Sequence, residues 1–271
     1  MTVGELLALA RGLGVARLDA QLLLGQHLDR SRAWLIAHED GKVGDDMVRA
    51  VEAALRQRAA GVPLAYLTGE REFHGLTLRV TPAVLIPRPE TEGLVDWALE
   101  LIGRRAATEV VDLGTGSGAI ALAIKHAHPS ARVTATDASA DALTVARENA
   151  ARLGLEIEWR HGDWWAALAG RRFDLALSNP PYIAAGDPHL PALAHEPTLA
   201  LSPGGDGLDA LRTIIAGASA HLHPGGWLVL EHGFDQAEAV RGLLARAGFQ
   251  AVETRRDLGG QERTTAGRHR I

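Results

Sequence analysis

Residues 110–118 read VVDLGTGSG, an apolar run followed by three glycines at alternate positions. This stretch begins as a short apolar strand, turns on glycines and leads into an apolar helix over residues 119–126. Glycine tolerates a left-handed backbone, so the main chain and the helix N-terminus can approach a bound nucleotide closely at this turn. The stretch therefore predicts a nucleotide-type ligand, and the alternative is a tight turn that binds nothing.

Strands and helices alternate along the chain on both sides of this turn. Strands are expected at residues 110–113, 132–137, 173–178, 226–231 and 249–254, of which 110–113 and 173–178 are the clearest apolar runs. Helices are expected between and after them, at residues 119–126, 140–153, 208–221 and 236–247. The alternation predicts an α/β fold with a doubly wound, mostly parallel sheet. Ligands of such sheets bind beyond the carboxyl ends of the strands, at the topological switch point.

The N-terminal part of the chain shows helical periodicity only. Thr2 and Glu5 have the spacing of a capping box ahead of the first apolar stripe. We interpret residues 1–72 as a small helical bundle that docks the substrate. Near-alternating apolar residues and a stiff proline-rich turn follow, so a hairpin linker is expected over residues 73–90 and the main domain over residues 91–271.

The composition is that of an ordinary globular protein. The 271 residues are 46% apolar and 23% charged, which excludes wholesale disorder. The formal net charge of −5 argues against stable nucleic-acid binding. The absence of cysteine excludes disulfide scaffolds, thiolate metal sites and cysteine nucleophiles. No apolar run reaches the roughly 18 residues of a membrane span and no signal peptide is recognisable, so we expect a cytoplasmic protein without membrane contact.

Two ligands are compatible with the glycine-rich turn. Gly114, Gly116 and Ala119 satisfy the dinucleotide pattern G-x-G-x-x-G/A, with Asp137 about 20 residues farther on, so an NAD-dependent oxidoreductase is one alternative. Two features favour S-adenosylmethionine instead. Asp112 stands two residues before the first glycine, where a carboxylate can meet the ammonium of the methionine group. The loop pattern G-x-G-x-G suits a nucleoside that carries an amino-acid tail and no pyrophosphate.

Further contacts to this cofactor can be assigned along the chain. Asp137 ends the second strand and would accept hydrogen bonds from both ribose hydroxyls. Asp163 would accept a hydrogen bond from the adenine amino group, and Trp164 would offer a stacking face. Trp165 is adjacent, so the sequence leaves open which of the two indoles faces the ligand and which is a core residue.

The most informative stretch is Asn179-Pro180-Pro181-Tyr182, directly after the strand at residues 173–178. Two consecutive prolines provide no N–H donor and restrict φ, so the Pro180 carbonyl is held rigidly without a competing local donor. The Asn179 side-chain carbonyl gives a second acceptor beside it. A planar NH2 group fits this pair, and Tyr182 can lie over the planar group that carries the nitrogen.

Such a clamp answers a chemical need. The lone pair of an amide or aromatic amine nitrogen is delocalised, so it attacks a methyl sulfonium poorly. Acceptance of both hydrogens favours a more tetrahedral nitrogen and directs its lone pair at the methyl carbon, most strongly in the transition state. The stretch therefore predicts N-methylation that needs neither a metal nor a strong general base.

A proline-rich segment follows the clamp. Between Ser178 and Gly207 lie six of the twelve prolines of the chain. A long connection of this kind is usually functional, as a lid or a binding loop.

The chain resembles the HemK/PrmC family, the bacterial release-factor glutamine N5-methyltransferases, over nearly its whole length. The likeness rests on PLAYLTG at residues 63–69, IPRPETE at 86–92, the glycine-rich stretch and NPPY at 179–182. IPRPETE together with NPPY is specific to this group, whereas either the glycine loop or NPPY alone is shared by many methyltransferases.

The resemblance implies a helical N-terminal domain, a hairpin linker and a Rossmann-like seven-stranded S-adenosylmethionine-dependent methyltransferase domain with an antiparallel last strand. The implied cofactor contacts come from Gly114, Thr115, Gly116, Ser117, Gly118, Asp137, Trp164 and Asn179. The implied substrate contacts come from Asn179, Pro180, Pro181 and Tyr182. The implied reaction methylates N5 of the glutamine in the Gly-Gly-Gln motif of peptide chain release factors and leaves S-adenosylhomocysteine.

Two features of this chain are not typical of the resemblance. Gly259-Gly260-Gln261 repeats the tripeptide of the family's substrate, and we interpret the match as coincidence rather than as a self-methylation site. His232 stands between Glu231 and Gly233, and we expect a packed or solvated histidine there rather than a catalytic one.

Other functions remain as alternatives. The nearest is the same chemistry on a glutamine of a ribosomal protein. An adenine-N6 DNA methyltransferase would use the same clamp, but it would need a basic target-recognition region and would flip its base. An oxidoreductase leaves Asn179-Pro180-Pro181-Tyr182 unexplained, and the intact glycine loop and clamp argue against a non-catalytic binding module.

Overall fold

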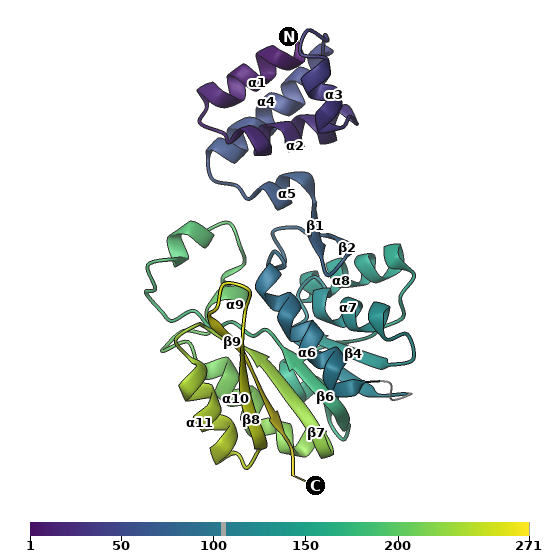
Figure 1. Cartoon of the computed structure of the whole chain (residues 1–271), viewed down its shortest axis with the longest axis vertical. Helices are drawn as coiled ribbons and strands as arrows, with labels where there is room; N and C mark the ends of the chain where they lie inside the picture. The colour runs from purple at the N-terminus through teal and green to yellow at the C-terminus, as the bar shows by residue number, and fades with distance from the viewer. Residues whose placement is uncertain (104–106, 271) are drawn as a thin grey trace. The chain divides into compact units, whose positions relative to one another are not determined.

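The computed structural model describes residues 1–103 and 107–270 (Figure 1). The chain forms two compact units, Met1–Glu70 and Arg71–Ile271. The boundary lies close to residue 72, where the sequence predicts the end of the helical domain. None of the helices in the described ranges combines the length and apolarity that a bilayer crossing needs.

The first unit is a helical bundle. Its helices are α1 (Val3–Gly12), α2 (Arg17–Leu28), α3 (Arg32–Ala37), α4 (Asp45–Ala59) and α5 (Leu64–Thr68). The predicted capping box is present, since Thr2 Oγ1 accepts the Glu5 N–H and Glu5 accepts the Thr2 N–H. The leucines Leu6, Leu23, Leu24, Leu35 and Leu55 are fully buried and form the core of this unit. The unit therefore has a hydrophobic core of its own.

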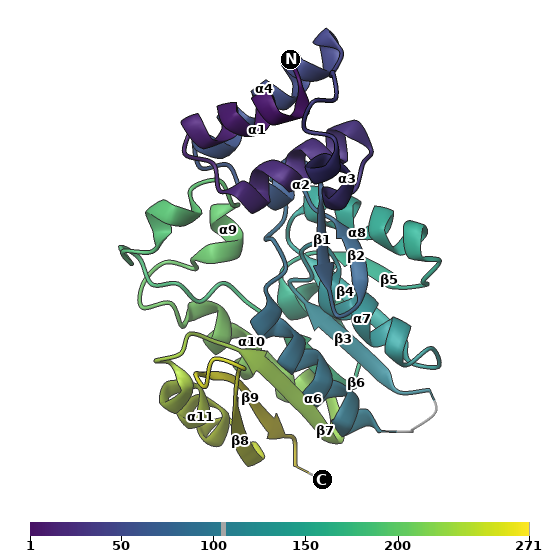
Figure 2. The ribbon, with the colours of Figure 1, turned by 45° about the horizontal axis from the view of Figure 1, so that its top comes forward.

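The second unit is built on a sheet of seven strands in the order β5-β4-β3-β6-β7-β9-β8 (Figure 2). The strands are β3 (Glu109–Leu113), β4 (Arg132–Asp137), β5 (Glu158–His161), β6 (Phe173–Ser178), β7 (Leu222–Glu231), β8 (Gln250–Arg256) and β9 (Glu262–Arg268). β3 to β7 pair in parallel, whereas β9 runs antiparallel to both β7 and β8. The α/β fold and the parallel sheet predicted from the sequence are confirmed.

Helices cover both faces of this sheet (Figure 2). One face carries α6 (Glu92–Ile102), α7 (Ala119–Ala127) and α8 (Ala140–Leu153), and the other carries α10 (Asp209–His221) and α11 (Ala237–Arg246). Successive side chains of a strand point to opposite faces of the sheet, so neighbouring residues of β3 pack against different helices. Val110 is buried with α6 and α7, and Val111 is buried with α10 and α11. A two-stranded hairpin of β1 (Glu70–Phe73) and β2 (Leu76–Arg79) precedes the sheet.

Two strands carry no clear apolar pattern in the sequence. β5 lies at the edge of the sheet and its residues are mostly exposed. β9 reads Glu-Arg-Thr-Thr-Ala-Gly-Arg, yet Thr264, Thr265 and Ala266 are buried, because the strand lies between β7 and β8. Burial of β9 thus depends on its two neighbours and not on its own composition. β7 also begins at Leu222 rather than at residue 226, the predicted start.

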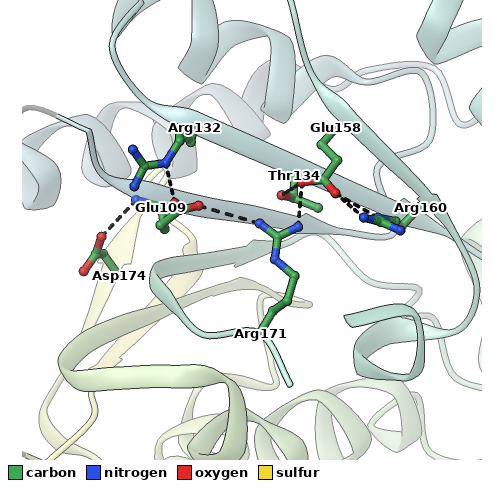
Figure 3. A network of polar contacts seen from close by, with 7 residues as sticks. All are labelled: Glu109, Arg132, Thr134, Glu158, Arg160, Arg171 and Asp174. Atoms are coloured by element: carbon green, nitrogen blue, oxygen red, sulfur yellow. Dashed lines mark hydrogen bonds and ion pairs between the residues drawn. The ribbon is translucent and has the colours of Figure 1, made fainter. Parts of the chain in front are cut away.

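A polar network joins the amino ends of β3, β4 and β5 (Figure 3). Glu109 at the start of β3 pairs with Arg132 at the start of β4. Arg171, just before β6, donates to Glu158 of β5 at 2.5 Å and lies 3.7 Å from Glu109. Exposed pairs of this kind contribute about 0–1 kcal/mol each. The network ties the strands together at the edge of the sheet opposite to the carboxyl ends.

Trp165 packs against a glycine in the middle of α10. Its indole is 7% exposed and donates a hydrogen bond to the Ile214 carbonyl at 2.8 Å. Its ring stacks on His221 with the centroids 4.9 Å apart. A Cβ atom added to Gly217 would lie 2.3 Å from Cδ1 of Trp165. The helix therefore accepts this indole only because residue 217 has no side chain.

We expect Gly217→Ala to destabilise the protein, although alanine is the better helix former. Overpacking of a core costs about 1–3 kcal/mol, more than the roughly 1 kcal/mol gained when a helical glycine is replaced. The matched control is Gly242→Ala in α11, where an added Cβ meets only the flexible end of Arg246, at 3.2 Å. Urea denaturation followed by circular dichroism should give a lower free energy of unfolding for Gly217→Ala alone. Equal stability of the two variants would contradict the packing described for Trp165.

Candidate functional site

A cavity of about 400 Å³ opens at the carboxyl ends of β3, β4 and β6, within the size range of small-molecule sites. The predicted cofactor residues that line it are Gly114, Thr115, Gly116, Ser117, Asp137, Asp163, Trp164 and Asn179. Of the predicted substrate residues, Asn179 and Pro181 line it. Asp112, Gly118, Pro180 and Tyr182 are not part of the lining.

The glycine-rich loop is tied to the end of the neighbouring strand. The backbone N–H groups of Gly114 and Thr115 both donate to the Thr136 carbonyl, each at 2.9 Å. Gly114 has a φ of +72°, and a Cβ atom there would lie 3.0 Å from the Trp164 ring. Gly116 also has a positive φ, but open space surrounds the position of its missing Cβ. The loop thus offers an unobstructed backbone surface to the cavity.

Gly118 has a structural position instead. It is the N-cap of α7, with a φ of +85°, and an added Cβ would meet Leu122 at 3.0 Å and Ala146 at 3.3 Å. The residue allows α7 to approach α8 closely, which keeps the N-terminus of α7 beneath the loop.

Asp137 presents its carboxylate at the end of β4. Oδ2 accepts the Gly116 N–H and Oδ1 accepts the Ser139 N–H, both at 2.8 Å. Burial raises the pKa of Asp137, and these two backbone hydrogen bonds oppose that rise. Each oxygen keeps a further lone pair, so the side chain can accept two hydrogen bonds from a ligand such as a ribose diol.

Asp112, predicted to meet the ammonium group of the cofactor, lies beneath the loop and outside the lining of the cavity. The side chain is fully buried, and Oδ2 accepts hydrogen bonds from the Thr115 hydroxyl at 2.6 Å and the Ala121 N–H at 3.3 Å. Burial raises its pKa to about 7. Its Oδ1 is buried and has no hydrogen-bond partner among the described residues. In this position Asp112 supports the loop from below through Thr115.

The two adjacent tryptophans have separate positions. Trp164 lines the cavity, whereas Trp165 belongs to the core. Trp164 has a φ of +41°, which is rare for a bulky residue and is maintained only where the surroundings enforce it. This backbone conformation turns consecutive indoles to opposite sides. The question that the sequence left open is thus answered in favour of Trp164 as the residue at the cavity.

Asn179 is oriented by a hydrogen bond that the sequence did not predict. Its Nδ2 donates to the Thr91 hydroxyl at 3.1 Å. In the described part of the chain no donor pairs with Oδ1, so the carbonyl oxygen of the amide is available at the cavity. The preceding Ser178 is fixed to the end of β3, because its hydroxyl donates to the Leu113 carbonyl at 2.7 Å.

Tyr182 lies behind the clamp rather than on the cavity surface. Its hydroxyl donates to Glu231 Oε1 at 3.2 Å, and its backbone carbonyl accepts from Gln236 Nε2 at 2.9 Å. A Cβ atom on Gly207 would lie 2.3 Å from that carbonyl oxygen. Three segments therefore hold Tyr182, and the ring needs to turn if it is to cover a substrate.

The proline-rich segment is attached to the IPRPETE turn by a buried carboxylate. Glu196 Oε1 accepts from Arg88 Nη2 at 2.5 Å, and Oε2 accepts the Ile86 N–H at 3.2 Å. The segment contains η3 (Leu190–Leu193) and α9 (Thr198–Leu201). It adds Pro197, Leu199, Ala200, Ser202 and Pro203 to the lining of the cavity. The predicted binding loop therefore contributes directly to the cavity.

The two atypical features are structural. His232 is fully buried, with Nε2 2.7 Å from the Thr265 hydroxyl, and burial lowers its pKa. Gly259-Gly260-Gln261 forms the turn between β8 and β9, where Asp257 Oδ1 accepts the Gln261 N–H at 2.9 Å. The histidine is packed, as expected, and the tripeptide has a local role in the hairpin.

Two family models match the chain. The PrmC N-terminal domain matches residues 5–69, and the methyltransferase small domain matches residues 96–206. A solved methyltransferase from Pyrococcus furiosus covers 73% of this chain and 90% of its own, with a TM-score of 0.56 at 20% identity. The second unit thus has the fold of S-adenosylmethionine-dependent methyltransferases.

Relatives match both units at once. The release factor glutamine methyltransferase of Xylella fastidiosa strain Temecula1 is 53% identical over 257 residues, which are 94% of each chain. The enzyme of the same name from Bordetella pertussis is 52% identical over 261 residues, 94% of this chain and 95% of its own. Identity at this level over nearly the full length assigns the whole chain, and it belongs to the release factor glutamine methyltransferase family.

Proposed function

We propose that this protein transfers a methyl group from S-adenosylmethionine to N5 of the glutamine in the Gly-Gly-Gln motif of peptide chain release factors. The observation that carries the proposal is the orientation of Asn179. Its NH2 group is engaged by Thr91, so its carbonyl oxygen is the atom left to accept a hydrogen from an amide substrate. Family membership supports the identity of that substrate.

The residues around the cavity fit the cofactor. When bound, S-adenosylmethionine supplies an electrophilic methyl group on a sulfonium. Asp137 would accept hydrogen bonds from the ribose hydroxyls, and Asp163 would accept one from the adenine amino group beside the Trp164 ring. The open backbone at Gly116 would contact the rest of the molecule. We infer that Asp112 acts on its amino-acid end through the Thr115 hydroxyl.

The acceptor would be held by Asn179 and Pro180. Oδ1 of Asn179 and the carbonyl of Pro180 would each accept one hydrogen of the glutamine NH2 group. This pair of hydrogen bonds disfavours the planar nitrogen and directs its lone pair at the methyl carbon, as transition-state stabilisation by preorganised groups requires. One N–H proton leaves as the N–CH3 bond forms, and S-adenosylhomocysteine is the second product.

The helical unit would dock the release factor. Met1–Glu70 forms a compact unit with a core of its own, and the described site residues all lie in the second unit. A unit without site residues is free to recognise the body of a protein substrate, which supports a folded protein rather than free glutamine as the acceptor.

The direct test is methyl transfer from labelled S-adenosylmethionine to purified release factor, with ribosomal proteins, DNA and no acceptor in parallel. Mass spectrometry of the Gly-Gly-Gln peptide should locate the label on the glutamine. Label on a ribosomal-protein glutamine would transfer the chemistry to that substrate class. Label on DNA would show that the protein methylates adenine instead of glutamine.

We expect Asn179→Ala to lower kcat by roughly 10²–10³, the loss typical when one preorganised group is removed from a transition state. The Asn179 carbonyl would act on the acceptor, so the dissociation constant of the cofactor should stay within about two-fold of wild type, well below 1.4 kcal/mol. Single-turnover kinetics and calorimetry measure the two quantities. Unchanged turnover would contradict the clamp.

Asp137→Asn should weaken cofactor binding by about ten-fold or more, because hydrogen bonds to a charged group contribute about 1.5–3 kcal/mol. The control is Asp141→Asn, which makes the same charge change at an exposed position in the first turn of α8. Calorimetry with S-adenosylhomocysteine should separate the two variants. Equal affinity in both would remove the ribose role of Asp137.

Removal of residues 1–69 should lower kcat/KM for the intact release factor by about ten-fold or more, a loss of at least 1.4 kcal/mol of docking energy. A short peptide with the Gly-Gly-Gln motif should be methylated equally by both chains, because it cannot use the docking unit. Cofactor affinity of the truncated chain reports whether the second unit is folded. An equal loss with peptide and intact factor would argue against docking.

A further inference from the structure

A chain of buried polar groups runs from the acceptor clamp into the protein. Asn179 Nδ2 donates to the hydroxyl of Thr91, which is 4% exposed. The Thr91 hydroxyl in turn stabilises the ionised Glu231 carboxylate by a hydrogen bond. Glu231 Oε1 also accepts from the Tyr182 hydroxyl at 3.2 Å. One carboxylate at the end of β7 is therefore linked to both ends of the Asn179–Tyr182 stretch.

This carboxylate is placed where a charge is costly. Glu231 is fully buried, and its Oε2 has no hydrogen-bond partner among the described residues. Burial raises its pKa to about 7, and Thr91 is the largest influence that opposes the rise. Glu231 is not itself one of the proposed cofactor or substrate contacts, so its burial needs another explanation.

The direction of the hydrogen bonds around Glu231 explains why a carboxylate is buried at this position. An ionised carboxylate only accepts hydrogen bonds, so Thr91 has to use its single hydroxyl proton toward Glu231. The Thr91 oxygen is then an acceptor toward Asn179, and only the NH2 side of the amide can face it. The carbonyl side of Asn179 is left for the substrate. A protonated Glu231 can donate to Thr91, which can then donate to the Asn179 oxygen and occupy it.

We propose that Glu231 is a positioning residue, which acts through Thr91 to present the Asn179 carbonyl oxygen to the substrate amide and through Tyr182 to fix the other end of the clamp. The proposal deepens the proposed function, on which it rests. The active form is the one with an ionised carboxylate and with the hydroxyl protons of Thr91 and Tyr182 both pointing at it.

The charged and titratable groups around Glu231 decide its ionisation. Arg263 from β9 favours the charged form, and Glu90 from η1 (Pro89–Thr91) disfavours it. The neighbouring His232 has a lowered pKa and carries no charge in the neutral range, and Tyr182 has a pKa raised far above neutrality. Among these groups, Glu231 is the one whose pKa is raised to about 7.

The first test observes Asn179 itself and needs no acceptor. The side-chain amide resonances of Asn179 in the full chain labelled with nitrogen-15 should shift with pH around a midpoint near 7. They should be independent of pH in Glu231→Gln, because the titrating group is gone. A titration that persists unchanged in Glu231→Gln, or none in wild type, would overturn the proposal.

The second test is kinetic. Glu231→Gln should lower kcat about ten-fold or more with unchanged KM for the release factor and unchanged cofactor affinity. In wild type kcat should fall as the pH drops below about 7, since protonation removes the active form. This acid limb should be absent in Glu231→Gln. An acid limb that persists would point to Asp112, whose pKa is also raised to about 7, and would overturn the role of Glu231.

Two controls separate positioning from loss of structure. Glu253→Gln makes the same charge change on β8, at a side chain that is 64% exposed, and should leave kcat unchanged. Thr265→Val removes a buried hydroxyl that bonds His232, close to Glu231 in the fold, and should lower stability without altering the pH profile. A kcat loss in Thr265→Val equal to that in Glu231→Gln would argue for a merely structural role.

A double-mutant cycle tests the relay through Thr91. Thr91→Val and Glu231→Gln should each lower kcat, and the double variant should be no slower than the worse single variant, because both break the same chain of hydrogen bonds. Multiplied losses would show independent roles and would overturn the relay. A wild-type chain that methylates no acceptor but shows the Asn179 titration would contradict the proposed function and leave the relay in place.

Discussion

The parallel pairing of β3 with β6 is the constraint on which the site depends. Its register sets Asp112 opposite Leu177, so the glycine-rich loop and Asn179 leave the sheet side by side. The Ser178 hydroxyl then fixes the two strand ends to each other through the Leu113 carbonyl, at 2.7 Å. Cofactor loop and acceptor clamp are far apart in the sequence, and this pairing alone makes them neighbours. Reaction geometry of the kind required for methyl transfer tolerates errors of well below about 1 Å, and hydrogen bonds between adjacent strands supply that precision.

The fold could be predicted from the sequence wherever burial leaves a pattern. β3 and β6 are buried on both faces and are mostly apolar, which is typical of central parallel strands, and β4 is buried although it alternates apolar residues with threonine. β5 at the edge and β9 at the antiparallel position carry no such pattern. β9 is buried by its neighbours β7 and β8, and its threonines are satisfied by partners such as His232. β5 and β9 become strands through their contacts with neighbouring strands, and the periodicity of a single sequence carries no information on such contacts.

The residues of the site also fall into two groups, those that a sequence pattern predicts and those that only the packing brings together. Residues that act through their backbone or at strand ends, such as the glycine loop, Asp137 and Asn179, lie at the cavity where the sequence pattern predicts them. Thr91 and Glu231 received no role from spacing, because they meet Asn179 and Tyr182 from segments 88 and 49 residues away. Asp112 lies under the loop, where its Oδ2 accepts from the Thr115 hydroxyl and the Ala121 N–H, and no pattern in the sequence indicates these partners. The residue types in the sequence indicate the chemistry of the site. The hydrogen-bond partner of each side chain follows only from the packing of the folded chain.

The buried carboxylate of Glu231 works against the stability of the fold. Its ordinary pKa of 4.5 rises to about 7, so the folded state holds the proton more tightly than the unfolded chain. Stability therefore falls as the pH rises from about 4.5 to 7, the range in which the unfolded chain has lost this proton and the folded carboxyl still holds it. A neutral residue of similar size would avoid this cost, as replacements of buried charges by apolar groups often do. Another buried carboxylate near the clamp, Glu196, is in contrast paired directly with Arg88 at 2.5 Å. A carboxylate held at 231 against this cost is most simply explained by its use, because only an acceptor without a proton keeps the hydrogen bonds of Thr91 and Tyr182 pointing away from the substrate.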